Sequence, residues 1–240
     1  MKNLIKASVI AMVPLSVSTA QAQDWEFTAS FYLYMAETET GVGGNNITLS
    51  FSDALDNLDF AGMGSFEASR GPWTLLADYM LTDLSFGTDT PGPVFSGVNT
   101  NAKTQIATFV ALLDVHEAQG STFAIGGGVR WFDTDTTITF LPGPGAGRTV
   151  GSRDNWTDAI IAARYQFDIA QNWSGTVFVD YGGFSGDTET WQLLATADWK
   201  FADNWVARFG YRQIGVENDE GGRGYEFEQS GPVIGIAYNF

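Results

Sequence analysis

The chain has few side chains able to do acid–base or metal chemistry. It contains one histidine, His116, and no cysteine. A single imidazole cannot build a multi-histidine metal centre, and a chain without cysteine forms neither a disulfide nor a thiolate zinc site. His116 comes directly before a short turn at 117–120, where the nearest hydroxyl, Ser121, is not held as a nucleophile. We therefore expect no enzymatic activity and no cofactor.

Three aspartates, Asp53, Asp56 and Asp59, recur at every third residue and would share one face of a short helix. They are weak candidates for a divalent-cation site, because their spacing does not match the ligand pattern of an EF-type loop. The alternative interpretation is a solvated acidic face. Ser50 or Ser52 can cap this helix at its N-terminus.

A larger set of charged residues occupies alternate positions within apolar segments. Between Trp191 and Phe201, for example, apolar side chains fill every second position, and Gln192, Thr196, Asp198 and Lys200 stand between them. This period of two is typical of a β-strand with one apolar and one polar face. The charges on the polar face fall in the middle of the strands, where we expect them to line the lumen of a closed sheet. They are Asp78, Arg130, Asp158, Arg164, Asp180, Asp198, Lys200, Arg208 and Arg212.

The same alternation recurs along the whole chain after Trp25 and predicts an all-β protein of ten strands, with eight or twelve as alternatives. Most strands would be about 10–15 residues long, which is enough to cross a bilayer at a tilt. Short and long connections alternate, as expected for an antiparallel up-and-down transmembrane β-barrel whose every second turn faces the periplasm. The short connections are 70–72, 117–120, 170–172 and 202–204, and the longer ones are 37–58, 87–98, 136–152, 183–190 and 217–224.

Composition and charge exclude several other classes of protein. The 240 residues carry a formal net charge of -16, which argues against a nucleic-acid groove, because such a groove needs basic patches. Hydrophobic residues make up 44% of the chain and aromatic residues 14%, so a disordered chain is not expected. Tryptophans close to the short turns, such as Trp73 and Trp205, fit a membrane interface better than the core of a soluble β-sandwich.

The N-terminus has the pattern of a secretory signal peptide. Lys2 and Lys6 precede a short apolar run, and Ala20-Gln21-Ala22 matches a small-x-small cleavage site. The sequence thus predicts a signal peptide over 1–22 and one barrel domain over 23–240. Within that domain, 37–58 would be a long first extracellular loop that contains the short helix. We expect a protein of the Gram-negative cell outer membrane, exported through the inner membrane.

Two segments carry a family resemblance. The C-terminal stretch 235–240, with Gly235, Tyr238 and Phe240, resembles the insertion signal of bacterial outer-membrane proteins, although Val233 replaces the polar residue usual before the glycine. The segment SFSDALDNLDF at 50–60 resembles a group of uncharacterised proteobacterial barrel proteins. The resemblance implies the fold, the location and recognition by periplasmic chaperones and the barrel-assembly machinery. It implies no activity.

The sequence leaves two roles open for such a barrel. The first is a non-catalytic role as envelope structure or as a narrow, porin-like passive pore, because barrels of about eight strands are filled by side chains and much larger ones are open. The second is surface binding or adhesion through acidic extracellular loops. Expected partners are outer-membrane lipid and lipopolysaccharide, with no nucleic acid, and the sequence does not define an oligomeric state. We expect Arg208 and Arg212 to pair with Asp198 and Asp180 and to narrow the bore.

Overall fold

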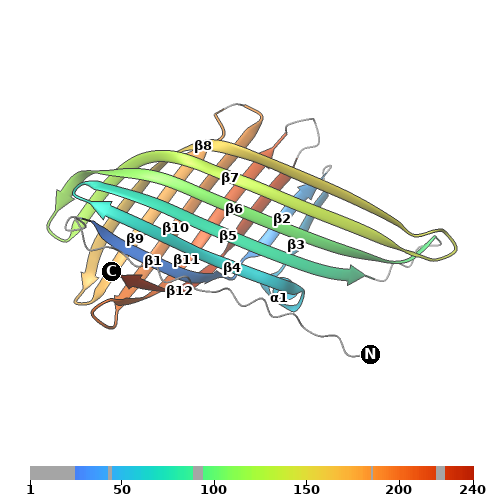
Figure 1. Ribbon diagram of the computed structural model, residues 1–240, viewed down its shortest axis with the longest axis horizontal. Helices are drawn as coiled ribbons and strands as arrows, with labels where there is room; N and C mark the ends of the chain where they lie inside the picture. The colour runs from blue at the N-terminus through green and yellow to red at the C-terminus, as the bar shows by residue number, and fades with distance from the viewer. Residues whose placement is uncertain (1–24, 43–44, 89–93, 185, 220–224) are drawn as a thin grey trace, which may run out of the picture.

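The computed structural model describes residues 25–42, 45–88, 94–184, 186–219 and 225–240 (Figure 1). The expected signal peptide lies outside these residues. No helix within them is long and apolar enough to span a membrane. The elements are β1 (Glu26–Tyr34), β2 (Glu37–Val42), β3 (Asn45–Leu49), α1 (Phe51–Asp56), β4 (Leu58–Arg70), β5 (Trp73–Thr88), β6 (Phe95–Ala118), β7 (Ser121–Pro142), β8 (Arg148–Ala170), β9 (Trp173–Gly182), β10 (Thr188–Lys200), β11 (Trp205–Asn218) and β12 (Tyr225–Asn239).

The strands form one antiparallel sheet that closes on itself. From β4 to β12 each strand pairs with the next one in the chain, and β1 pairs with both β4 and β12. β2 continues the line of β1 along β12, after an interruption at Met35 and Ala36. β1 and β2 therefore occupy one place in the wall, and β3 pairs only with β2 outside the ring. Within the described residues the structure confirms a closed antiparallel barrel of ten strands.

The short connections lie at one end of the barrel, together with the C-terminus (Figure 1). Three of them contain a residue with positive φ: Gly71 at 54°, Gly120 at 75° and Asn172 at 66°. Glycine and asparagine tolerate this left-handed conformation, which lets adjacent strands join in a tight turn. We call this end the short-turn end and the opposite one the long-connection end.

The outer face of the barrel is apolar where a bilayer would cover it. Phe31 and Leu33 on β1 are 67% and 61% exposed, and Ile161 on β8 is 58% exposed. Side chains that follow them in sequence, such as Tyr34, are buried and therefore point inward. The outward residues form a band of exposed aromatic and aliphatic side chains, as lipid-facing positions require. We call this band the lipid-facing belt.

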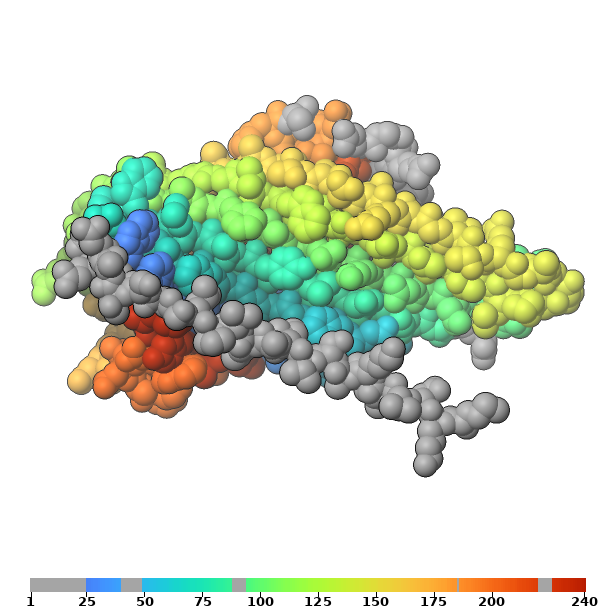
Figure 2. Space-filling model, in the orientation of Figure 1, coloured from blue at the N-terminus to red at the C-terminus, as the bar shows by residue number. Residues whose placement is uncertain are grey.

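One of the expected long loops is largely strand. β6, β7 and β8 are 24, 22 and 23 residues long and project past the rest of the barrel at the long-connection end (Figures 1 and 2). The expected loop at 136–152 is thus a hairpin whose turn is confined to the residues between Pro142 and Arg148. The threonine-rich alternation of β7 continues past the lipid-facing belt. The sequence pattern did not distinguish this strand extension from a loop.

The segment 37–58 contains the β2–β3 hairpin and then α1. The helix begins at Phe51, slightly earlier than expected, because Ser50 is its N-cap and its side chain accepts a hydrogen bond from the backbone N–H of Asp53. The predicted short helix is therefore present, between a strand that leaves the barrel and β4, which returns to it (Figure 1).

Candidate functional site: the barrel interior

A fully buried ion pair lies at the centre of the barrel. Arg130 on β7 donates to Asp180 on β9 at 2.6 Å, and both side chains are 0% exposed. Arg130 also donates to the hydroxyls of Thr108 and Thr190 at 3.1 and 3.0 Å. Strand alternation places these side chains inside, because their sequence neighbours carry the lipid-facing belt. The guanidinium therefore links strands β6, β7, β9 and β10 through the interior.

Arg212 on β11 forms a second junction beside the first. It donates to Asp78 on β5 at 3.0 Å and to the hydroxyl of Tyr32 on β1 at 2.9 Å. Its other partner is the side-chain oxygen of Gln192 on β10, and the amide of Gln192 donates to Asp180 at 3.2 Å. Gln192 thus joins the two junctions into one network across the bore. We call this set the central network.

Two further ion pairs lie closer to the short-turn end. Arg164 on β8 donates to Glu67 on β4 at 2.9 Å, a contact between strands on opposite sides of the ring. Arg208 donates to both carboxylate oxygens of Asp198 at 2.9 Å, in the fork geometry that arginine prefers. The expected pairing of Arg208 with Asp198 is present, whereas Arg212 pairs with Asp78 and not with Asp180.

Two of the expected lumen charges behave differently. Asp158 is buried and accepts hydrogen bonds from Thr188 at 2.6 Å and from the indole of Trp156 at 3.1 Å. Lys200 is exposed at the end of β10, where the short turn begins, and so does not line the buried interior. The alternation assigned Lys200 to the inward face of β10. Because β10 ends at this residue, the side chain lies at the end of the barrel and is exposed.

Apolar side chains fill the interior on both sides of the central network. Towards the long-connection end, Phe132 stacks on Trp156 with ring centroids 4.8 Å apart. Ile214, at 0% exposed, belongs to the same cluster. A second cluster towards the short-turn end contains Leu112, also 0% exposed, and Phe178. These apolar side chains alternate with the lipid-facing belt and point inward, so they share the interior with the charged residues.

The combined arrangement fills much of the bore with side chains. In a water-filled channel the inward side chains would be solvated, yet Arg130, Phe132 and Leu112 are at most 2% exposed. Polar and apolar layers alternate along the axis, and every arginine among these inward residues has a carboxylate partner. Burial of this extent favours a filled interior over a wide water-filled channel.

Sequence reasoning missed several members of these networks. Glu67 lies on β4, where glycines blur the alternation, so its inward position had no clear signal. Gln192 and Tyr32 lie on the polar face of their strands. The alternation of polar and apolar residues could therefore have identified both as inward residues. The inward apolar residues of β6 had no such signal, because both faces of that strand are apolar. On β11, Ile214 and Val216 lie on the same face as Arg208 and Arg212, which the pattern marks as polar.

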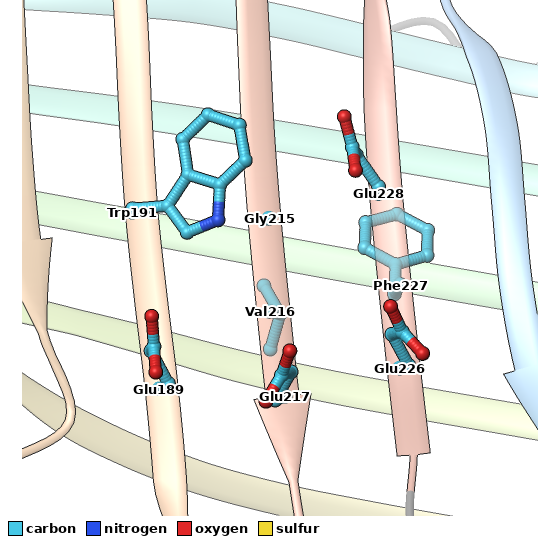
Figure 3. A pocket seen from close by; sticks show the side chains of 8 residues that line it. All are labelled: Glu189, Trp191, Gly215, Val216, Glu217, Glu226, Phe227 and Glu228. Carbon is cyan, nitrogen blue, oxygen red and sulfur yellow. The ribbon is translucent and has the colours of Figure 1, made fainter.

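The outer face at the long-connection end carries a row of glutamates (Figure 3). Glu189, Glu217 and Glu226 are direct cross-strand neighbours on β10, β11 and β12. The indole of Trp191 covers Gly215 beside them, since a Cβ there would meet the ring nitrogen. They line a small pocket of about 40 Å³. The surface-binding role through acidic loops stays a prediction of the sequence.

The remaining candidates lie apart from the interior. The three aspartates around α1 are exposed; Asp53 accepts from the Ser50 cap and Asp59 accepts from Ser85. Within the described part of the chain no group of acidic or histidine side chains is arranged to hold a metal ion. His116 is exposed at the short-turn end of β6.

The residues of the expected insertion signal lie in the seam that closes the barrel. Gly235 faces inward, where a Cβ would approach the Cβ of Tyr32 to 2.8 Å. Tyr238 packs against Trp205 and Phe240 with centroids 4.8 and 5.0 Å apart. The backbone N–H of Phe240 donates to the carbonyl of Phe27 at 2.9 Å, so the last residue still ties β12 to β1.

The fold belongs to a recognisable class of protein. The crystal structure of the outer-membrane protease OmpT from Escherichia coli matches with a TM-score of 0.57 and 9% sequence identity, covering 94% of this chain and 99% of that one. The attachment invasion locus protein Ail of Yersinia pestis matches with a TM-score of 0.41 and 10% identity, covering 90% and 99%. The match to OmpT, together with the closed ten-stranded sheet, shows that the chain has the fold of an outer-membrane β-barrel. No family model and no curated protein matches it, so the expected family stays a resemblance.

Proposed function

We propose that this protein is an outer-membrane β-barrel with a non-catalytic, structural role in the cell envelope, and that its bore is closed to solutes. The filled interior carries the proposal. The central network joins β1, β5, β7, β9, β10 and β11, and apolar clusters lie on both sides of it. These layers favour the structural role over the narrow passive pore.

A membrane location is supported by the lipid-facing belt and by the ring of backbone hydrogen bonds, which is closed where β1 pairs with both β4 and β12. Lipid offers no partners to backbone N–H and C=O groups, so only a closed barrel or a helix can satisfy them there. Expected partners are outer-membrane lipid and lipopolysaccharide. The non-catalytic role is supported by the position of His116, which is exposed at the short-turn end, away from the buried networks.

The orientation we propose places the long-connection end outside the cell. Trypsin added to intact cells is then expected to cut after Arg148 or Arg153, which are exposed on the projecting part of β8. The matched internal control is Arg70, which is exposed beside a short turn and should be cut only after the cells are lysed. Cleavage after Arg70 in intact cells, with Arg148 and Arg153 protected, would invert the orientation.

Closure of the bore can be tested in vesicles. Vesicles that contain the folded protein should swell in isotonic arabinose or glucose no faster than protein-free vesicles, because the layered interior leaves no water path. A general porin in the same lipid serves as the positive control. Swelling that follows the amount of folded protein would contradict the closed bore and favour the passive pore.

A further inference from the structure

Hydrogen bonding between neighbouring wall strands stops early at one place. The pairing of β1 with β4 ends at Phe31 and Gly64. Among the described residues, the next stretch of β4, Leu58–Met63, pairs with β5 alone. On the other side, Tyr32–Tyr34 and Glu37 pair with β12, and β3 joins only from Thr38 onward. Two free backbone edges therefore face each other, and we call the space between them the wall notch.

Two glycines show that the strands separate there. A Cβ at Gly64 would lie 2.9 Å from the carbonyl oxygen of Ser30, so β1 and β4 are in contact at that level. At Gly62, among described residues, only the Phe60 ring would approach such an atom, at 3.2 and 3.5 Å. No atom of β1 comes that close. β1 has thus moved away from β4 within two residues.

The wall notch lies in the upper part of the lipid-facing belt. On β1 the outward side chains run from Phe31 and Leu33, both strongly exposed, to the first acidic residue, Glu37. Across the notch, Phe60 on β4 is 50% exposed. The belt therefore continues without interruption to the edge of the notch, and the change from apolar to acidic residues marks its upper boundary.

Behind the notch lies the apolar cluster of the long-connection end. Met63 and Tyr32, one on each free edge, both pack against that cluster. Met63 is directly paired with Met80 of β5, which is 3% exposed. The notch thus connects the lipid-facing belt with an apolar part of the interior.

We propose that the wall notch binds an acyl chain of an outer-leaflet lipid, which lies over Gly62 and contacts Met63. Lipid acyl chains would contact the belt on both sides of the notch. If the notch stayed empty, the apolar side chains beside it would lose van der Waals contacts. Hydrocarbon offers no hydrogen-bond partner to the free N–H and C=O groups, so we expect water and lipid head groups to reach them from the end of the notch beside Glu37. The inference rests on the proposed membrane location and is independent of whether the bore conducts.

The three methionines after the expected cleavage site form a built-in test, because Met35, Met63 and Met80 occupy three different settings. Met35 lies between two inward residues, Tyr34 and Ala36, and so points to lipid. Global replacement by photo-methionine places a diazirine at each position with little change of shape. After irradiation in phosphatidylcholine vesicles, mass spectrometry of peptides locates the lipid adducts.

We expect adducts on Met35 and Met63 and about tenfold fewer on Met80, since a close-packed interior admits no lipid chain. Gly62→Leu should fill the notch and lower the Met63 adduct severalfold, with the Met35 adduct unchanged. Gly151→Leu is the matched control, because a Cβ there meets only ordinary contacts at 3.6 and 3.7 Å on the projecting part of β8. Gel migration before and after heating checks folding.

Two results would overturn the proposal. One is a Met63 adduct no higher than that of Met80 in the unmodified barrel, a comparison that needs no variant to fold. The other is a Met63 adduct that Gly62→Leu leaves unchanged in a folded barrel. If the protein does not insert into the membrane, the Met35 adduct should be absent as well. This outcome differs from a folded, inserted barrel whose notch binds no acyl chain, in which the Met35 adduct is present and the Met63 adduct is no higher than that of Met80.

Discussion

Arg130→Met is expected to lower the free energy of unfolding of the barrel by about 3–5 kcal/mol, because it leaves the carboxylate of Asp180 buried without its cation. Both side chains of the pair are 0% exposed, so no water replaces the lost guanidinium. Gln192 alone would remain as a donor to Asp180, at 3.2 Å. Urea unfolding of the vesicle-bound barrel, followed by tryptophan fluorescence, measures the loss.

Two further variants make this result specific. Arg130→Met combined with Asp180→Leu should recover most of the lost stability, since an apolar pair of similar size leaves no buried charge. Arg153→Met is the matched control: Arg153 pairs with Asp133 at 2.8 Å, but its side chain is 62% exposed, so we expect a change of less than about 1 kcal/mol. Equal losses for Arg130→Met and Arg153→Met, or a double variant no more stable than the single one, would contradict a structural role of the buried pair.

The fold was predictable from the sequence because its two main signals are local. Alternation of apolar and polar residues gives the strand face, and glycine or asparagine at the tight turns gives the connections. The same parity identified Arg130, Arg212 and Asp198 as inward residues. Their partners depend on which strands lie opposite each other in the ring. The alternation within a single strand does not indicate which other strand faces it across the bore.

The closed interior was the larger omission. Ile106 lies in a strand whose two faces are both apolar, and Phe132 directly follows Trp131, so alternation cannot show which of these side chains meets lipid. The wall notch was equally hidden. It arises because the pairing of β1 with β4 stops at Phe31 and Gly64, and no local residue pattern records where such a pairing ends.

The interior also changes what the two arginines of β11 are expected to do. From the sequence alone, Arg208 and Arg212 were the groups that narrow the bore. In the structure, apolar clusters containing Ile214 and Leu112 lie on the two sides of the central network. Removal of both arginines should therefore destabilise the barrel, because Asp78 and Asp198 lose their cations. It should leave the apolar layers in place.

The most direct test of the closed barrel is ion conductance in planar lipid bilayers, with the wild type beside Arg208→Ala combined with Arg212→Ala. We expect no steady current steps from the wild-type protein, because its layered interior would exclude water and ions. The double variant should show at most brief, small, cation-preferring openings, since its unpaired carboxylates attract cations while the apolar layers remain. Stable, discrete current steps from the wild-type barrel, reproduced with the amount of folded protein, would contradict the closed bore.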